Sequence, residues 1–161
     1  MNEIDLSFVK ASQILPLIHI LAVIFLVCAQ VCMILIARIF MKNGQVKFNA
    51  ILSYLKGYER FFVLFLLCIC ASGFAMSQGS DFKFSDPMIK GVLATLWTGV
   101  GFIVLNFAYM HYKISSLKRA LSAGDEFEAN EHLIIIVRYF IPLNLAISLF
   151  CVYLGVTIGE F

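Results

Sequence analysis

Charged side chains are scarce in this chain. Only 14% of its 161 residues are Asp, Glu, Lys or Arg, and twelve basic against ten acidic residues give a net charge of +2. Such a balance lacks the basic surface that nucleic-acid binding requires, so no nucleic-acid partner is expected. The sequence also has no Ser, His and Asp arrangement, phosphate-binding loop or zinc-spaced motif. These absences exclude the common signatures of soluble hydrolases, nucleotide-binding domains and zinc proteins.

The features of a secreted protein are missing as well. The segment before the first apolar run carries Glu3 and Asp5 with a single Lys10, whereas a cleavable signal has a basic leader. No small-residue cleavage site follows the run, so we expect it to stay in the membrane. The cysteines cannot form a loop-stapling disulfide framework, because all of them fall inside apolar runs. They are Cys28, Cys32, Cys68, Cys70 and Cys151.

Apolar residues dominate what is present. They make up 61% of the chain, and the mean hydropathy is +0.94. One helix needs roughly 20 apolar residues to cross a bilayer, and four such runs with their connectors occupy nearly the whole chain. We therefore predict an all-α fold, an antiparallel four-helix transmembrane bundle forming a single domain over residues 1–161. The expected spans lie at about 14–39, 61–76, 88–111 and 133–158.

Local signals predict several helix ends. Asp86 can cap the third span and Pro87 fits its first helical position. The helix that continues this span is expected to stop near Gly124. Asp125 and Glu128 have the spacing of a capping box, so the fourth helix should begin in water and carry His132 within its first turns.

The first connector, residues 41–59, has two interpretations. It breaks at Asn43-Gly44 and then places apolar residues at helical spacing between two lysines, which is typical of a short helix lying in the membrane interface. A simple extension of the second span fits the same pattern equally well. The apolar residues are Phe48, Ile51, Leu52 and Leu55.

The distribution of basic residues predicts the orientation. Because they concentrate at the first and third connectors, we expect these connectors to be cytoplasmic. Both termini should then lie on the periplasmic, outer side of a bacterial inner membrane, in a multi-pass arrangement. The basic residues concerned are Arg38, Lys42, Lys47, Lys56, Arg60, Lys113, Lys118 and Arg119.

Polar residues inside spans are the candidates for function, since each costs free energy to insert. His19 shares a helical face with Ser12, Ala22, Leu26 and Gln30, which should make a polar stripe toward the bundle interior. An imidazole there can ligate a haem iron or another metal, or transfer a proton. A core histidine hydrogen-bonded to a neighbouring helix is the alternative.

Lys90 begins the third span at the same outer end as His19. Its helical face carries Trp97 and the small residues Ala94, Gly101 and Ala108, which would let a helix or a flat macrocycle approach closely. Lys90 could pair with a haem propionate there. Snorkelling of the lysine to the interface is the alternative.

Other candidates lie toward the cytoplasmic end. His111 and His132 could form a second metal or haem site, but His111 is roughly 30 Å along its helix from Lys90. Arg38, Arg60 and Arg138 lie where phospholipid head groups would satisfy them.

Soft copper ligands are a further possibility. Cys28, Cys32 and Met33 occupy neighbouring positions in the first span. In the second span, Cys68 and Cys70 point about 200° apart on a helix, so they cannot share one ion without a break.

Several segments, in order and spacing, resemble the HemJ-type protoporphyrinogen oxidase and CopD-like group of small four-span bacterial membrane proteins. The resemblance covers most of the chain. Its segments are residues 18–23 around His19, Glu59-Arg60 with Gly73, residues 88–90, residues 109–112 and Pro142.

The resemblance implies a haem b-associated protein in which porphyrinogen oxidation is the suspected reaction. The histidine and lysine that the family uses correspond to His19, as axial ligand or proton acceptor, and Lys90, as carboxylate partner. We count Gln30, Trp97 and Arg138 among the expected cofactor contacts. The expected partners are the lipid bilayer, a porphyrin or haem, and further copies of the chain or an electron-transfer protein. One alternative is a CopD-like copper transport component that uses Met33, Cys28, Cys32 and His19. The other is a non-catalytic membrane subunit that only packs against partners.

Overall fold

The chain folds into long helices. The computed structural model describes residues 11–42, 48–77 and 87–159, and within them all residues except a turn at 124–125 are helical. The helices in chain order are α1 (Ala11–Lys42), α2 (Phe48–Ser77), α3 (Pro87–Ala123), α4 (Glu126–Ile135), the π-helix η2 (Ile136–Phe140) and α5 (Ile141–Gly159).

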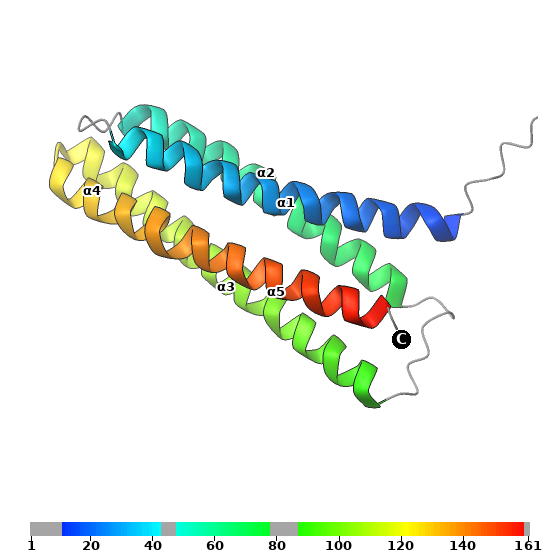
Figure 1. Ribbon diagram of the computed structural model, residues 1–161. Helices are drawn as coiled ribbons and strands as arrows, with labels where there is room; N and C mark the ends of the chain where they lie inside the picture. The colour runs from blue at the N-terminus through cyan, green and yellow to red at the C-terminus, as the bar shows by residue number, and fades with distance from the viewer. Residues whose placement is uncertain (1–10, 43–47, 78–86, 160–161) are drawn as a thin grey trace, which may run out of the picture.

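These elements form four rods. α4, η2 and α5 follow one another without a break, so the fourth rod is continuous (Figure 1). We call the end where α1 and α3 finish and α2 and α4 begin the hairpin end, and the other end the opposite end. α1 packs along α2 and α5, and α3 packs along α4, η2 and α5. The all-α four-helix bundle that the hydropathy pattern predicts is thus confirmed.

All four rods are long and apolar enough to cross a membrane, as the sequence predicts. They are residues 14–41, 48–77, 87–123 and 126–157. The second rod corrects one expectation, because α2 runs unbroken from Phe48 and no separate interface helix precedes it. The alternative, an extension of the second span, is right. The predicted break at Asn43-Gly44 lies outside the described residues.

The helix ends at the third connector follow the predicted chemistry. Gly124 has φ +78°, a left-handed conformation that glycine adopts without strain. The Gly124 and Asp125 N–H groups donate to the carbonyls of Leu121 at 3.2 Å and Ala120 at 3.0 Å, which closes α3 in a Schellman motif. Asp125 Oδ1 then accepts the Glu128 N–H at 2.9 Å and caps α4.

Other predicted ends are only partly covered by the structure. Pro87 is the first residue of α3, as predicted. The proposed cap, Asp86, lies outside the described residues. His132 lies within the second turn of α4, where the capping-box spacing places it.

The π-helix was not predicted. Ile141 donates its N–H to the Ile136 carbonyl five residues back, which widens the helix by one residue. Pro142 follows directly, and in an α-helix its ring would clash with the carbonyl of Arg138 four residues earlier. The widened turn gives the proline ring the space it needs.

Buried side chains concentrate toward the hairpin end. There Phe62 of α2 stacks on Phe107 of α3 with ring centroids 4.5 Å apart. Toward the opposite end the two hairpins separate (Figure 1), and none of the side chains at 90–102 or 149–157 is buried. The largest buried apolar side chains are Phe62, Ile51, Leu55, Met110, Leu117, Leu133, Ile136 and Ile141.

Candidate functional site

His19 lies on the interior stripe of α1. Ala22, Leu26 and Gln30 are 5%, 3% and 0% exposed, which confirms that this face points into the bundle. His19 itself is half-buried, two turns from the start of α1. It is therefore reachable from the opposite end while its ring remains in contact with α2.

The hydrogen bonds of His19 determine which ring nitrogen carries the proton. Its Nδ1 lies 2.8 Å from Ser72 Oγ of α2. The single hydroxyl proton of Ser72 goes to the Cys68 carbonyl at 2.5 Å, with the Ile69 carbonyl at 3.2 Å. In the tautomer in which Ser72 Oγ accepts from His19, Nδ1 is protonated and Nε2 presents its lone pair.

This arrangement is typical of metal-ligating histidines, which donate their second ring N–H to a fixed acceptor. Among the described residues, the side-chain hydrogen bond of the ring is the one between Nδ1 and Ser72, and the ring also has a backbone hydrogen bond with Ile69. The site thus has an oriented imidazole with an available donor atom. Sequence reasoning selected His19 but missed Ser72.

α2 accommodates the imidazole closely. A Cβ added at Gly73 would lie 3.4 Å from His19 Cε1, so the absence of a side chain lets the ring rest on the helix. Met76, one turn beyond Ser72 on the same face of α2, is half-buried. Met76 is thus a thioether on the same face of α2 as Ser72, and sequence reasoning did not select it.

Gln30 links α1 to α5 at a position deeper in the bundle than His19. Its Nε2 donates to Ser148 Oγ of α5 at 3.1 Å, while its Oε1 is buried without a hydrogen-bond partner. Eleven residues separate it from His19, or about 16 Å along α1. Gln30 therefore joins α1 to α5 and lies away from the His19 ring.

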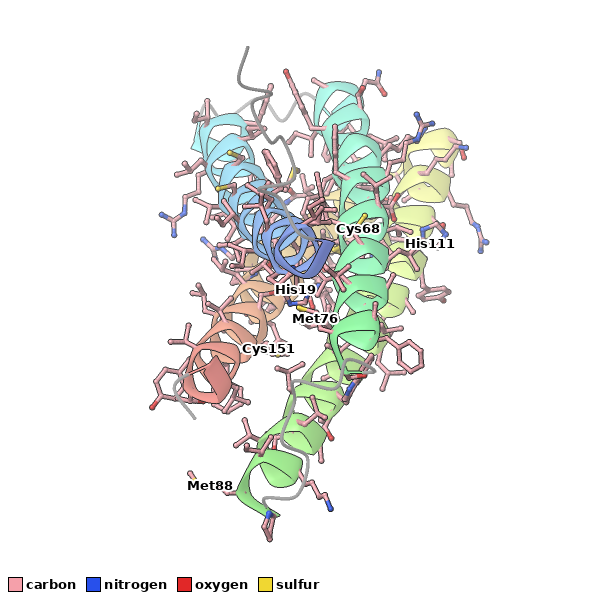
Figure 2. All side chains as sticks on the ribbon, turned by 90° about the vertical axis from the view of Figure 1, so that its right-hand side faces the viewer. His19, Cys68, Met76, Met88, His111 and Cys151 are labelled. Atoms are coloured by element: carbon pink, nitrogen blue, oxygen red, sulfur yellow. The ribbon has the colours of Figure 1, made fainter. Side chains whose placement is uncertain are left out.

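Lys90 and Trp97 lie on the outside of the bundle. Lys90 is exposed and Trp97 is 40% exposed. The small residues of the same stripe, Ala94, Gly101 and Ala108, are exposed too. The described contacts do not join Lys90 to His19, and Figure 2 shows the first turn of α3, marked by Met88, well apart from His19. The expected close approach at this stripe would thus involve a molecule outside the bundle.

The predicted copper ligands do not converge. Cys28 and Cys32 are exposed, whereas Met33 is 3% exposed and faces the core. Within residues 11–42, 48–77 and 87–159, no three His, Cys, Asp or Glu side chains form a group suited to a metal ion. Any copper bound at His19 would need ligands other than these cysteines.

The two remaining histidines have separate partners at the hairpin end. His111 Nδ1 of α3 lies 2.8 Å from Glu59 Oε1 of α2. His132 Nε2 lies 3.4 Å from Glu128 Oε1 one turn earlier in α4. These contacts give each histidine a carboxylate neighbour and do not assemble the second metal site that the sequence suggested.

Arg138, the deepest of the predicted head-group arginines, lies on η2 beside a hollow of about 450 Å³ between α1 and the fourth rod. Arg38 lines the same hollow from α1. Arg138 lies 21 residues before the end of α5 on the His19 side, or about 31 Å along the rod, so it is remote from that histidine.

An asparagine pair inside the spans was also missed. Asn106 Nδ2 of α3 donates to Asn144 Oδ1 of α5 at 2.8 Å and to the Phe140 carbonyl at 3.2 Å. Asn144 is fully buried, and its own Nδ2 has no partner. The sequence contained a signal for this pair, because a side-chain amide within an apolar span needs a hydrogen-bond partner in a membrane.

Comparison of the chain with family models, with curated proteins and with solved structures finds no match.

Proposed function

We propose that this chain is a haem b-associated protein of a bacterial inner membrane, in which His19 Nε2 would ligate the haem iron. The observation that carries the proposal is the Ser72 contact at Nδ1, which favours the tautomer with a lone pair on Nε2. A haem iron takes a neutral imidazole nitrogen as its axial ligand. The resemblance around His19 points to the same cofactor.

The donor chemistry at His19 fits this cofactor. The ring is held by an acceptor behind it and is half-buried in an apolar setting. Bound haem would supply one-electron chemistry. The chain's own contribution is to orient the imidazole through Ser72 and to keep Gly73 free of a side chain. Lys90 as a propionate partner remains a separate prediction, because the described contacts do not connect it with His19.

Porphyrinogen oxidation is the reaction that the resemblance implies, and it belongs to this proposal. In that role His19 is the ligand or proton acceptor. The outer ends of α1 and α3 would face the periplasm, because basic residues concentrate at the hairpin end.

A visible spectrum of the purified protein, together with its metal content, tests the proposal. We expect a Soret band with about one haem b per chain, because His19 offers one ligating nitrogen. Bound copper without haem would favour the CopD-like alternative. A protein without haem or copper after expression with added haem precursor would contradict the proposal and favour a non-catalytic subunit.

A further inference from the structure

The hollow at the hairpin end combines two cations with apolar walls. Arg38 enters it from α1 and Arg138 from η2, so the two positive charges come from different rods. Its other lining residues are apolar, namely Ile34, Met41, Val137 and Pro142. A volume of about 450 Å³ is within the range of small-ligand pockets.

The arginines have no ion-pair partner in the part of the chain that the structure describes. Of the described residues that line the hollow, none is acidic. Guanidinium groups have a planar fork of donors that matches phosphate oxygens. Two such groups on opposite walls suit one anionic group between them.

Both arginines lie toward the hairpin end of the apolar spans. Arg38 lies four residues before the end of α1, or about 6 Å from it. Arg138 follows the start of α4 by twelve residues, about 18 Å, so α4 extends beyond it toward water. Both lie within the apolar spans, where an unpaired charge is costly.

The surface next to the hollow favours a ligand with acyl chains. Leu35, one turn from Arg38, is 52% exposed, and Leu143, five residues after Arg138, is 49% exposed. An amphiphile could therefore place its anionic group between the arginines and its chains along these leucines. A free anion would leave that apolar surface unused.

The π-helix contributes to the site. Pro142 lines the hollow and the widened turn over Ile136–Phe140 carries Arg138. Val137 beside it is buried, while Arg138 is exposed on the hollow. Widened turns of this kind occur frequently at functional sites.

We propose that Arg38 and Arg138 form a binding site for the phosphate of an anionic phospholipid from the surrounding leaflet. The site is independent of the haem proposal, since it lies at the other end of the bundle from His19. It predicts a preference for phosphatidylglycerol over phosphatidylcholine, whose choline cation repels the arginines.

Native mass spectrometry of the full chain in a neutral detergent tests the site. Added phosphatidylglycerol should bind more tightly than phosphatidylcholine, and the R38Q/R138Q double variant should lose binding by about tenfold or more, because two charge-assisted contacts disappear. The matched control is Arg119→Gln, an exposed arginine of α3 outside the hollow. Its binding should stay within about twofold of wild type.

Two further arms keep the test decisive. Circular dichroism establishes that the double variant folds, and the salt dependence of lipid binding by the wild-type protein tests the electrostatic contact without any variant. Rising ionic strength should weaken the phosphatidylglycerol preference. Equal binding of the two lipids, full retention in a folded double variant, or displacement of the lipid by inorganic phosphate alone would overturn the proposal.

Discussion

At the residue scale, the state of one imidazole depends on a neighbouring hydroxyl. Ser72 has one proton, and the backbone of its own helix takes it. With that proton on a carbonyl, the oxygen can accept from His19, which favours the tautomer with the proton on Nδ1. Serines in membrane spans commonly donate to a carbonyl of their own helix. Here the same serine also orients the His19 ring, which leaves Nε2 as the nitrogen available to a ligand.

Removing that hydroxyl should lower the affinity for haem more than it lowers the stability of the fold. We expect Ser72→Ala to reduce haem affinity by about 10- to 100-fold, because the ring loses the acceptor that orients it. Ser77→Ala is the matched control, since Ser77 bonds only its own Phe74 carbonyl. Haem titration of both purified variants checks this. Equal affinities in Ser72→Ala and Ser77→Ala would show that Ser72 does not position the ligand.

A close contact between α3 and α5 makes a second residue-scale prediction. A Cβ added at Gly99 would lie 2.7 Å from Cys151 Sγ, so Gly99→Ala must displace that thiol. We expect a loss of about 1 kcal/mol in the free energy of unfolding, since overpacking forces side chains from their preferred rotamers. Unfolding in mixed micelles measures the change.

Removing Cys151 Sγ provides the control for the contact at Gly99. Cys151→Ala removes the atom that the new methyl group meets, so the double variant should regain most of the lost stability. Additive losses in the two single variants and the double variant would mean that the helices accommodate the methyl group elsewhere.

At the element scale, the sequence predicts where helices end better than it predicts irregular turns inside them. Gly124 and Asp125 carry their signals locally, since a positive φ and a capping carboxylate depend on adjacent residues. The π-helix depends on Pro142, whose effect on the preceding turn can be relieved by a kink, a break or a widened turn. Sequence alone does not distinguish these outcomes.

The Asn106 and Asn144 pair tests how α3 holds α5. Asn106→Leu should cost about 1 to 3 kcal/mol, because it leaves a buried Asn144 amide without its partner. Replacing both residues with Leu should cost less than the sum of the single changes. Micelle unfolding of the three variants gives the coupling free energy, and a value of zero would show that the bond does not join the helices.

At the scale of the whole molecule, hydropathy predicts four spans but not which faces meet. The interior stripe of α1 was predicted correctly because polar residues marked it. The stripe at Ala94, Gly101 and Ala108 carries only small residues, and its exposure depends on how α3 rotates against its neighbours. Apolar residues serve lipid-facing and core-facing positions equally well, so composition does not separate them.

The orientation of the bundle in the membrane is a prediction about the whole molecule. Cysteines introduced at Asn49 and Ser122, in a variant whose five native cysteines are alanine, should be protected from an impermeant reagent added outside whole cells. Both positions are exposed at the hairpin end. A cysteine at Thr157, near the other end of α5, should react. Reaction at Asn49 and Ser122 with protection at Thr157 would reverse the orientation and place His19 near the cytoplasm.

The haem-ligand role of His19 is the central claim, and the visible spectrum of His19→Ala tests it most directly. The H111A/H132A double variant is the control, because both histidines lie at the hairpin end with carboxylate neighbours of their own. We expect His19→Ala to insert normally but to lack the Soret band, while the control keeps it. A full, unshifted Soret band in His19→Ala would rule out His19 as the haem ligand.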